Sequence, residues 1–112
     1  MKLPNAHLAV AEQEKICGYL LNAAHPDNGG KAAFFGALGF HTENWRGLAA
    51  ALRELAENCA AAKSLASAHG TKYIVEGRIR TPGARTSWVR TVWIVDRGAE
   101  APRRVTAYPY QP

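Results

Sequence analysis

The hydrophobic pattern changes its period between the two halves of the chain, and this change constrains the fold more than any other feature of the sequence. Before about residue 62, apolar residues recur three and four positions apart, which is typical of amphipathic helices. From Thr71 onward, apolar and polar residues alternate in runs separated by turn residues, which is typical of strands. The sequence therefore predicts an α+β fold, with helices packed on one face of an antiparallel sheet.

Three helices are expected in the first half. The first covers residues 10–21 and ends at a segment rich in helix breakers, residues 22–30. The second covers residues 31–38, and the third follows a capping Thr42 and continues to about residue 61. Together, residues 1–62 form the helical part of a domain that spans residues 1–112.

Residues 63–112 are expected to form a three- to four-stranded sheet. Residues 63–69 suit either a frayed helix end or a short edge strand paired with the next one. Clear strands follow at 71–80, 85–96 and 103–108, and the sequence Thr-Pro-Gly-Ala at 81–84 predicts a type II turn between the first two. In the first clear strand, Tyr73, Val75 and Ile79 share one face, while Lys72, Arg78 and Arg80 share the other with Ile74 and Glu76.

Composition limits the class of protein. A chain of 112 residues with 47% hydrophobic content buries one ordinary core. Cys17 and Cys59 both stand on helical segments, which indicates buried thiols and neither a disulfide framework nor a metal site. The sequence has no signal-peptide pattern and no apolar run approaching the roughly 20 residues of a membrane helix, so we expect a cytoplasmic protein that makes no contact with a membrane.

The charge is positive and unevenly distributed. Fourteen Lys and Arg residues against nine Asp and Glu residues give a formal charge of +5. Much of the excess lies in the last third of the chain, which contains Arg78, Arg80, Arg85, Arg90, Arg97, Arg103 and Arg104. A basic sheet favours polyanionic partners such as nucleic acid.

The breaker-rich segment supplies the first candidate site. His25 lies six residues before Lys31, and Gly29-Gly30 separates them from one another. This order would place an imidazole, free backbone N–H groups and a cation around one anion, and histidine is the natural acid or base at neutral pH. The alternative is that His25-Pro26 only shapes the connection between helices and that Lys31 is solvated.

The strands supply the second candidate site. If neighbouring strands align, cations and hydroxyl groups converge on one patch: Lys72, Arg80, Thr91, Thr106 and Tyr108. The alternative is a solvated sheet face whose charges oppose aggregation. Trp88 and Trp93 fall on opposite faces, so that one can enter the core and the other can stack a base. We assign RNA contacts to Trp93 and to four arginines, Arg78, Arg80, Arg90 and Arg104.

Other candidates are weaker. His7, His41 and His69 compete with His25 for an acid–base role, and His69, next to Gly70-Thr71-Lys72, is the best of the three. The sequence has no glycine-rich phosphate loop with Gly-Lys-Ser, no Cys-x-x-Cys pair, no His-Glu-x-x-His and no Gly-x-Ser-x-Gly. No metal ligands are assigned.

Short blocks occur in order along nearly the whole chain: YLLN at 19–22, HP at 25–26, KAAFF at 31–35, LGF at 38–40, GTKY at 70–73, TVWI at 91–94 and RVTAYP at 104–109. These blocks resemble a bacterial domain family of uncharacterised function that occurs alone and as the C-terminal tip of large polymorphic secreted toxins. That family is in turn similar to the metal-independent ribonuclease toxins of the barnase, EndoU, colicin and RelE group. One departure is Asn28, at a position where such sequences often have glycine.

The resemblance implies a ribonuclease toxin that cleaves tRNA, rRNA or mRNA by transesterification to a 2′,3′-cyclic phosphate, without a cofactor. It implies that the catalytic residues are His25, Lys31, Lys72, Thr91, Thr106 and Tyr108. The implied partner is an acidic antitoxin or immunity protein that covers the basic sheet face. Two other classes stay open: a non-catalytic RNA-binding or ribosome-associated module, and a protein-interaction module of the immunity or antitoxin type.

Overall fold

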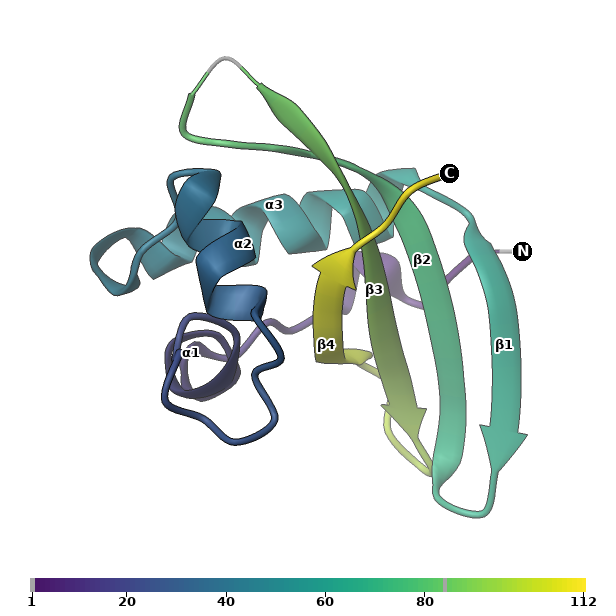
Figure 1. Ribbon diagram of the computed structural model, residues 1–112. Coiled ribbons are helices and arrows are strands. Elements are labelled where there is room, and N and C mark those ends of the chain that lie inside the picture. Colours follow the sequence, from purple (N-terminus) through teal and green to yellow (C-terminus); the bar gives the residue numbers. More distant parts are fainter. Residues whose placement is uncertain (1, 84) are drawn as a thin grey trace.

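The computed structural model describes residues 2–83 and 85–112 and contains a four-stranded antiparallel sheet beside a group of helices (Figure 1). The strands are β1 (Ala61–Ser67), β2 (Gly70–Arg80), β3 (Thr86–Asp96) and β4 (Arg103–Pro109), and they lie in the sheet in this order. The α+β prediction is therefore confirmed. Of the two alternatives for residues 63–69, the edge strand is correct, because residues 63–67 pair with β2 and residues 68 and 69 form the turn between the two strands.

The first helical region is shorter than predicted. It consists of α1 (Gln13–Lys15) and a π-helical turn, η2 (Ile16–Leu20), after a single 3₁₀ turn, η1 (Ala6–Leu8). Val10 does not begin the helix because its backbone pairs with the start of β4. The Val10 N–H donates to the Pro102 carbonyl at 2.9 Å, and the Arg104 N–H donates to the Val10 carbonyl at 3.1 Å.

The second and third helices are close to the prediction. α2 covers Lys31–Ala37, and α3 covers Trp45–Asn58 after a 3₁₀ turn, η3 (Thr42–Asn44). Thr42 is not the capping residue; instead the Asn44 side chain accepts the His41 N–H at 2.6 Å. α3 ends at Asn58 because the chain enters β1 at Ala61. The predicted turn at 81–84 includes Ala84, which lies outside the described residues.

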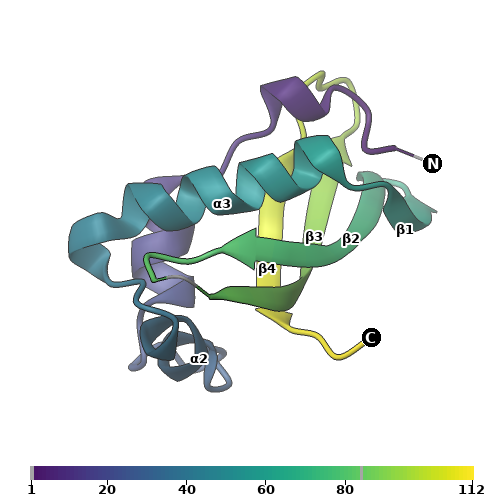
Figure 2. The ribbon, with the colours of Figure 1, turned by 90° about the horizontal axis from the view of Figure 1, so that it is seen from above.

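Helix α3 crosses one face of the sheet, as the view in Figure 2 shows. Its apolar side is fully buried, with Leu48, Leu52 and Leu55 at most 3% exposed. These leucines share a core with Val75 and Ile79 of β2. Burial of large aliphatic side chains against the sheet supplies the main driving force for this packing.

The strands alternate as the sequence predicts. Val75 and Ile79 of β2 face the core, and Lys72, Arg78 and Arg80 are exposed. The face turned away from α3, which we call the open face, therefore carries the basic side of β2.

Among the described residues, no helix is long and apolar enough to cross a membrane.

Gly77 allows α3 and β2 to approach closely, which predicts the effect of adding one methyl group. A Cβ at this position would lie 2.6 Å from Leu55 Cδ1 and 2.9 Å from Cys59 Sγ, so both side chains would have to move. We expect Gly77→Ala to lower the free energy of unfolding in urea by about 1–3 kcal/mol, the usual cost of overpacking.

Gly47→Ala is the matched control. Gly47 lies in α3, and nothing approaches within 4 Å of the position that its Cβ would take. The same substitution there should raise the free energy of unfolding by about 0.5–1 kcal/mol, because alanine favours the helix. Equal stability of Gly77→Ala and the wild type would contradict the close approach.

Candidate functional site

Four side chains from separate segments meet beside the edge strand β4. The Tyr19 hydroxyl, on η2, lies 3.5 Å from Thr106 Oγ1 on β4. The His25 ring packs edge-on against the Tyr19 ring with centroids 5.0 Å apart, and Lys31 Nζ lies 5.2 Å from the centroid of the same ring. We call Tyr19, His25, Lys31 and Thr106 the Tyr19 cluster. Three of its members were predicted from the sequence, and the structure brings those three together.

Asn28 organises the loop that carries His25. Its side chain is buried and donates to the carbonyls of Tyr19 at 2.6 Å and Leu20 at 3.2 Å. The Asn28 Oδ1 also accepts the Ala32 N–H at 2.9 Å, at the start of α2. The loop is thereby fixed to η2 on one side and to α2 on the other.

The loop also orients His25 and Lys31. The Asp27 N–H donates to His25 Nδ1 at 3.1 Å, so a neutral imidazole carries its proton on Nε2. Lys31 Nζ donates to the Asn28 carbonyl at 3.2 Å. Both side chains are half-buried. An anion that entered the cluster would meet an N–H donor and an ammonium group.

Tyr19 is the central residue of the cluster, and the sequence analysis did not single it out as a site residue. Burial disfavours its phenolate, but Lys31 and Thr106 stabilise that form more strongly, and together they hold the Tyr19 pKa below its usual value. The available signal was its position six residues before His25, at the end of the same helical region.

Arg104 lies on the buried side of β4 rather than on the surface. It is 1% exposed, and its pKa falls to about 10 because burial disfavours the guanidinium charge, while Tyr19 and Glu12 act in the opposite direction. The expectation of a surface contact to RNA from Arg104 was therefore wrong. The cause is an irregularity in β4: Thr106 is paired with Val92 and Arg104 with Trp93, so the extra residue between them turns Arg104 and Thr106 to opposite faces.

Thr91 and Trp93 also point into the core. Both are completely buried; the Thr91 hydroxyl donates to the Val75 carbonyl at 2.8 Å and accepts from Trp93 Nε1 at 2.9 Å. The placement of Thr91 on the same surface as Thr106, and of Trp93 where a base could stack on it, was therefore wrong. β3 has apolar side chains at odd-numbered and at even-numbered positions. The alternation of its sequence therefore did not show which face of the strand is buried.

The open face brings arginines and aromatic rings together. The Arg78 guanidinium lies 5.1 Å from the centre of the Trp88 ring, and the Arg90 guanidinium lies 4.5 Å from Tyr110 and 5.8 Å from Tyr108. We call these five residues the arginine–aromatic face. Of the two tryptophans in β3, Trp88 is the exposed one, with 36% of its surface accessible.

Arg90 is already paired within the chain. Its Nε donates to the Glu76 carboxylate, which directly faces it across β2 and β3. The hydrogen bond to Glu76, together with the nearby Tyr108, raises the Arg90 pKa above its usual value. Of the two guanidinium groups on this face, that of Arg78 is therefore more available to an external anion than that of Arg90.

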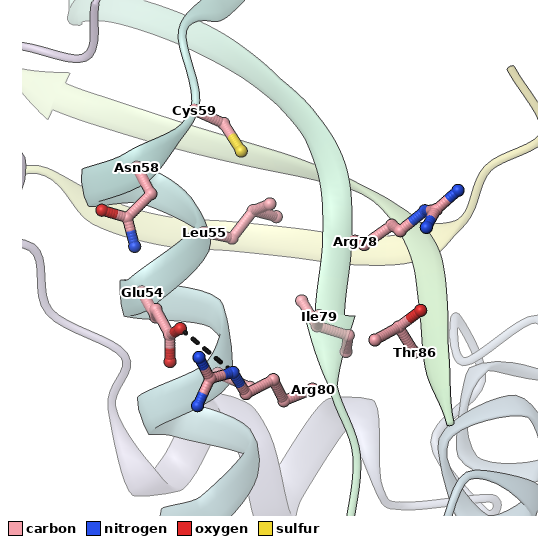
Figure 3. Close-up of a pocket in the computed structure, with 9 residues that line it drawn as sticks. Glu54, Leu55, Asn58, Cys59, Arg78, Ile79, Arg80 and Thr86 are labelled. Atoms are coloured by element: carbon pink, nitrogen blue, oxygen red, sulfur yellow. Dashed lines mark ion pairs between the residues drawn. The ribbon is translucent and has the colours of Figure 1, made fainter. Parts of the chain in front are cut away.

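The remaining predicted residues lie on the open face or at its end. Tyr108 pairs with Arg90 beside Thr106, whereas Lys72 lies two strands away from β4, opposite Ile94. Arg80 is farther from the other candidates: it forms a 3.6 Å ion pair with Glu54 at the rim of a pocket between α3 and β2 (Figure 3). Both side chains of that pair are well exposed, so it contributes little to stability.

The pocket in Figure 3 has no residue in common with the Tyr19 cluster. Its walls are Leu55 of α3, Cys59 directly after the end of this helix, and Ile79 of β2, with Glu54 and Arg80 at the rim. Within residues 2–83 and 85–112, no three His, Cys, Asp or Glu side chains come close enough together to hold a metal ion.

The chain belongs to a family described as a domain of unknown function (DUF6883), whose model matches residues 2–111. No curated protein matches the sequence. Among solved structures, the chain is similar to one in a contact-dependent growth inhibition toxin–immunity protein complex from Klebsiella pneumoniae 342, with a TM-score of 0.74 and 16% sequence identity. The similarity covers 96% of this chain and 97% of the other, and at this identity it establishes a common fold.

The hydrogen bonds of Thr91 predict a structural role for this residue. Thr91→Val keeps the shape of the side chain but leaves Trp93 Nε1 buried without its acceptor. We expect the free energy of unfolding to fall by about 1–3 kcal/mol, the cost of an unsatisfied buried group. Thr86→Val, at the exposed start of β3, is the control and should change stability by less than about 0.5 kcal/mol. Unchanged urea unfolding of Thr91→Val would argue against this role.

Proposed function

We propose that the protein is a ribonuclease toxin domain, which cleaves RNA by transesterification to a 2′,3′-cyclic phosphate and needs no metal ion. The observation that carries the proposal is the convergence of His25, Lys31 and Thr106 around Tyr19, beside the arginine–aromatic face. Such a set supplies a cation and N–H and O–H donors to a phosphodiester, which is what stabilisation of its transition state requires.

Each residue of the cluster has a role that follows from its geometry. Lys31 places its ammonium against the charge that develops on the phosphate. His25 presents Nε2, because Nδ1 is occupied by the Asp27 N–H. The Thr106 hydroxyl fixes one phosphate oxygen. These roles refine the acid–base role that the sequence predicts for His25.

The arginine–aromatic face would hold the nucleotides that flank the cleaved bond. Trp88 is exposed enough for a base to stack on it, and Arg78 lies next to it. Stacking on aromatic rings combined with cations along the backbone is the usual way of binding single-stranded nucleic acid. Lys72, elsewhere on the open face, and Tyr108, within the arginine–aromatic face, would contact further phosphates.

The comparison with known structures supports a toxin-related function and a protein partner. The similar fold occurs in a complex of a toxin with an immunity protein. An acidic partner that covered the arginine–aromatic face would neutralise the toxin and would bind by charge complementarity. The natural setting of the activity would be the bacterial cytoplasm, where its RNA substrates are.

A protein-binding function of the immunity type is the second candidate, since that same complex contains an immunity protein. Such a protein would use the open face for a partner without cleaving RNA. A non-catalytic RNA-binding module would keep the salt-dependent RNA affinity but would be indifferent to loss of His25 or Lys31.

Induced expression in bacteria separates these functions. We expect the wild-type chain to arrest growth and fragment RNA, and His25→Ala and Lys31→Ala each to reduce cleavage at least about 100-fold while the fold persists. Purified protein should leave 2′,3′-cyclic phosphate ends in the presence of EDTA. The control is His69→Ala at the exposed β1–β2 turn, which should remain fully active. Intact RNA and normal growth with the wild type would refute the ribonuclease.

The salt dependence of RNA affinity should be weaker when Arg78 is replaced. Replacing a residue that contacts one phosphate reduces the slope of log K against log salt concentration by about 1, so Arg78→Ala should have this effect on a non-cleavable RNA. Arg53→Ala, on the exposed side of α3, is the control for charge alone. Identical slopes for the two variants would exclude a specific phosphate contact at Arg78.

A further inference from the structure

The arginine–aromatic face consists of two neighbouring rows of side chains that run across the strands. In one row, Arg78 of β2 is paired with Trp88 of β3. In the next row, Arg90 of β3 is paired with Tyr108 of β4. Tyr110 connects the two rows, because its ring centre lies 4.5 Å from the Arg90 guanidinium and 6.2 Å from the centre of the Trp88 ring. Aromatic rings and guanidinium groups thus alternate in one continuous series of contacts from β4 to β2.

This series of contacts begins next to the Tyr19 cluster. Tyr108 lies two residues beyond Thr106 on β4, so both side chains point to the open face. β4 is an edge strand, and in Figure 1 it lies between the helices α1 and α2 and the rest of the sheet. An RNA whose cleaved phosphate is bound in the cluster therefore has the sheet on one side of that phosphate and the helical region on the other.

The two sides differ in charge. Residues 11–30, which contribute α1, η2 and the loop of His25, have one Lys or Arg residue against three acidic residues: Lys15 against Glu12, Glu14 and Asp27. All four of these side chains are exposed. Strands β2 and β3 contain four Arg and Lys residues and two acidic residues. The electrostatic attraction of a polyanion is therefore directed toward the sheet.

The rings of the arginine–aromatic face are suited to unpaired bases. Trp88 is exposed, and Tyr108 and Tyr110 are half-buried. A base can stack on such a ring only when its own face is free, whereas the neighbouring base pairs cover the faces of bases inside a duplex. Guanidinium groups between the rings suit the phosphates between successive bases. The face therefore fits a single strand and does not fit a duplex.

We propose that the substrate is RNA that is single-stranded on one side of the cleaved bond, and that the arginine–aromatic face holds the nucleotides of that side alone. The inference rests on the proposed ribonuclease function, which places the cleaved bond in the Tyr19 cluster. On the other side of the bond, the acidic segment 11–30 leaves the nucleotides in solvent, so that part of the RNA is free to be paired. The protein thus selects its cleavage site by the unpaired nucleotides that adjoin it.

Oligonucleotides with a single cleavable bond test this asymmetry. In a DNA strand that contains one ribonucleotide, only the bond after that ribonucleotide has the 2′-hydroxyl that transesterification needs. Moving the ribonucleotide along the strand changes the number of nucleotides on each side of the bond. We expect the nucleotides added on one side to raise kcat/KM about 10-fold or more, as one stacked base does, and those added on the other side to change it less than about 2-fold.

Partial duplexes test the requirement for unpaired bases. A complementary strand that covers the favoured side of the cleaved bond should remove the gain in kcat/KM, because its bases can no longer stack on the protein. A complementary strand that covers the other side should leave the gain in place. Equal effects of the two complementary strands would overturn the proposal.

Trp88 tests the stacking contact itself. Trp88→Ala should remove most of the gain from the added nucleotides, whereas Trp88→Phe retains a ring and should keep most of it. Leu65→Ala is the matched control, since Leu65 is another exposed apolar residue of the open face, on β1 and outside the arginine–aromatic face. The gain should be the same in Leu65→Ala as in the wild type.

Binding of an all-DNA strand gives a readout that does not depend on cleavage. This strand lacks the 2′-hydroxyl but retains the bases and phosphates that the face would contact. By fluorescence anisotropy, its affinity should exceed that of the corresponding duplex and should fall about 10-fold in Trp88→Ala. Equal affinity for the single strand and the duplex, or an unchanged affinity in Trp88→Ala, would refute the stacking contact.

The possible failures are distinguishable. Cleavage with an equal gain on both sides of the bond, or with no gain on either side, would overturn the one-sided substrate and leave the ribonuclease function intact. A wild type that cleaves none of the strands would overturn the ribonuclease function and the one-sided substrate together. Binding of the all-DNA strand would then decide separately whether the face holds unpaired nucleic acid.

Discussion

Two backbone hydrogen bonds between Val10 and the start of β4 connect the helical half of the chain to the edge of the sheet. They close a loop of about ninety residues and place the N-terminal segment alongside β4. η2 and the loop with His25 follow this segment directly, so the same pairing brings Tyr19 within reach of Thr106. The candidate site depends on this connection, since neither half contains all of its members.

The second determinant of the site is the irregularity in β4. In a regular strand Arg104 and Thr106 would face the same side, because side chains alternate with a period of two. The extra residue between them lets Thr106 face the cluster while Arg104 enters the interior. One short edge strand thus supplies a hydroxyl to the Tyr19 cluster on one face and a buried cation to the interior on the other.

The open face and the Tyr19 cluster have different chemistry. On the open face, cations are balanced by aromatic rings and by Glu76, an arrangement suited to binding. In the cluster, a tyrosine is surrounded by a lysine, a histidine and a threonine in a half-buried position, an arrangement that alters the acidity of the phenol. The two regions meet at β4, where Tyr108 lies two residues beyond Thr106.

The sequence by itself determined the α+β class, the strands β2, β3 and β4, and the two faces of β2, because these follow from the local period of apolar residues and from turn residues such as Pro82 and Gly83. It also identified the loop of His25 and Lys31, because a helix-breaking or charged residue can be recognised from its own identity, without knowledge of what lies near it in space. The face to which Thr91 points, the burial of Trp93 and Arg104, and the central position of Tyr19 were decided only by tertiary structure. They depend on which strands pair, on one extra residue in β4 and on contacts between residues more than eighty positions apart, and none of these leaves a signal in the local pattern of the chain.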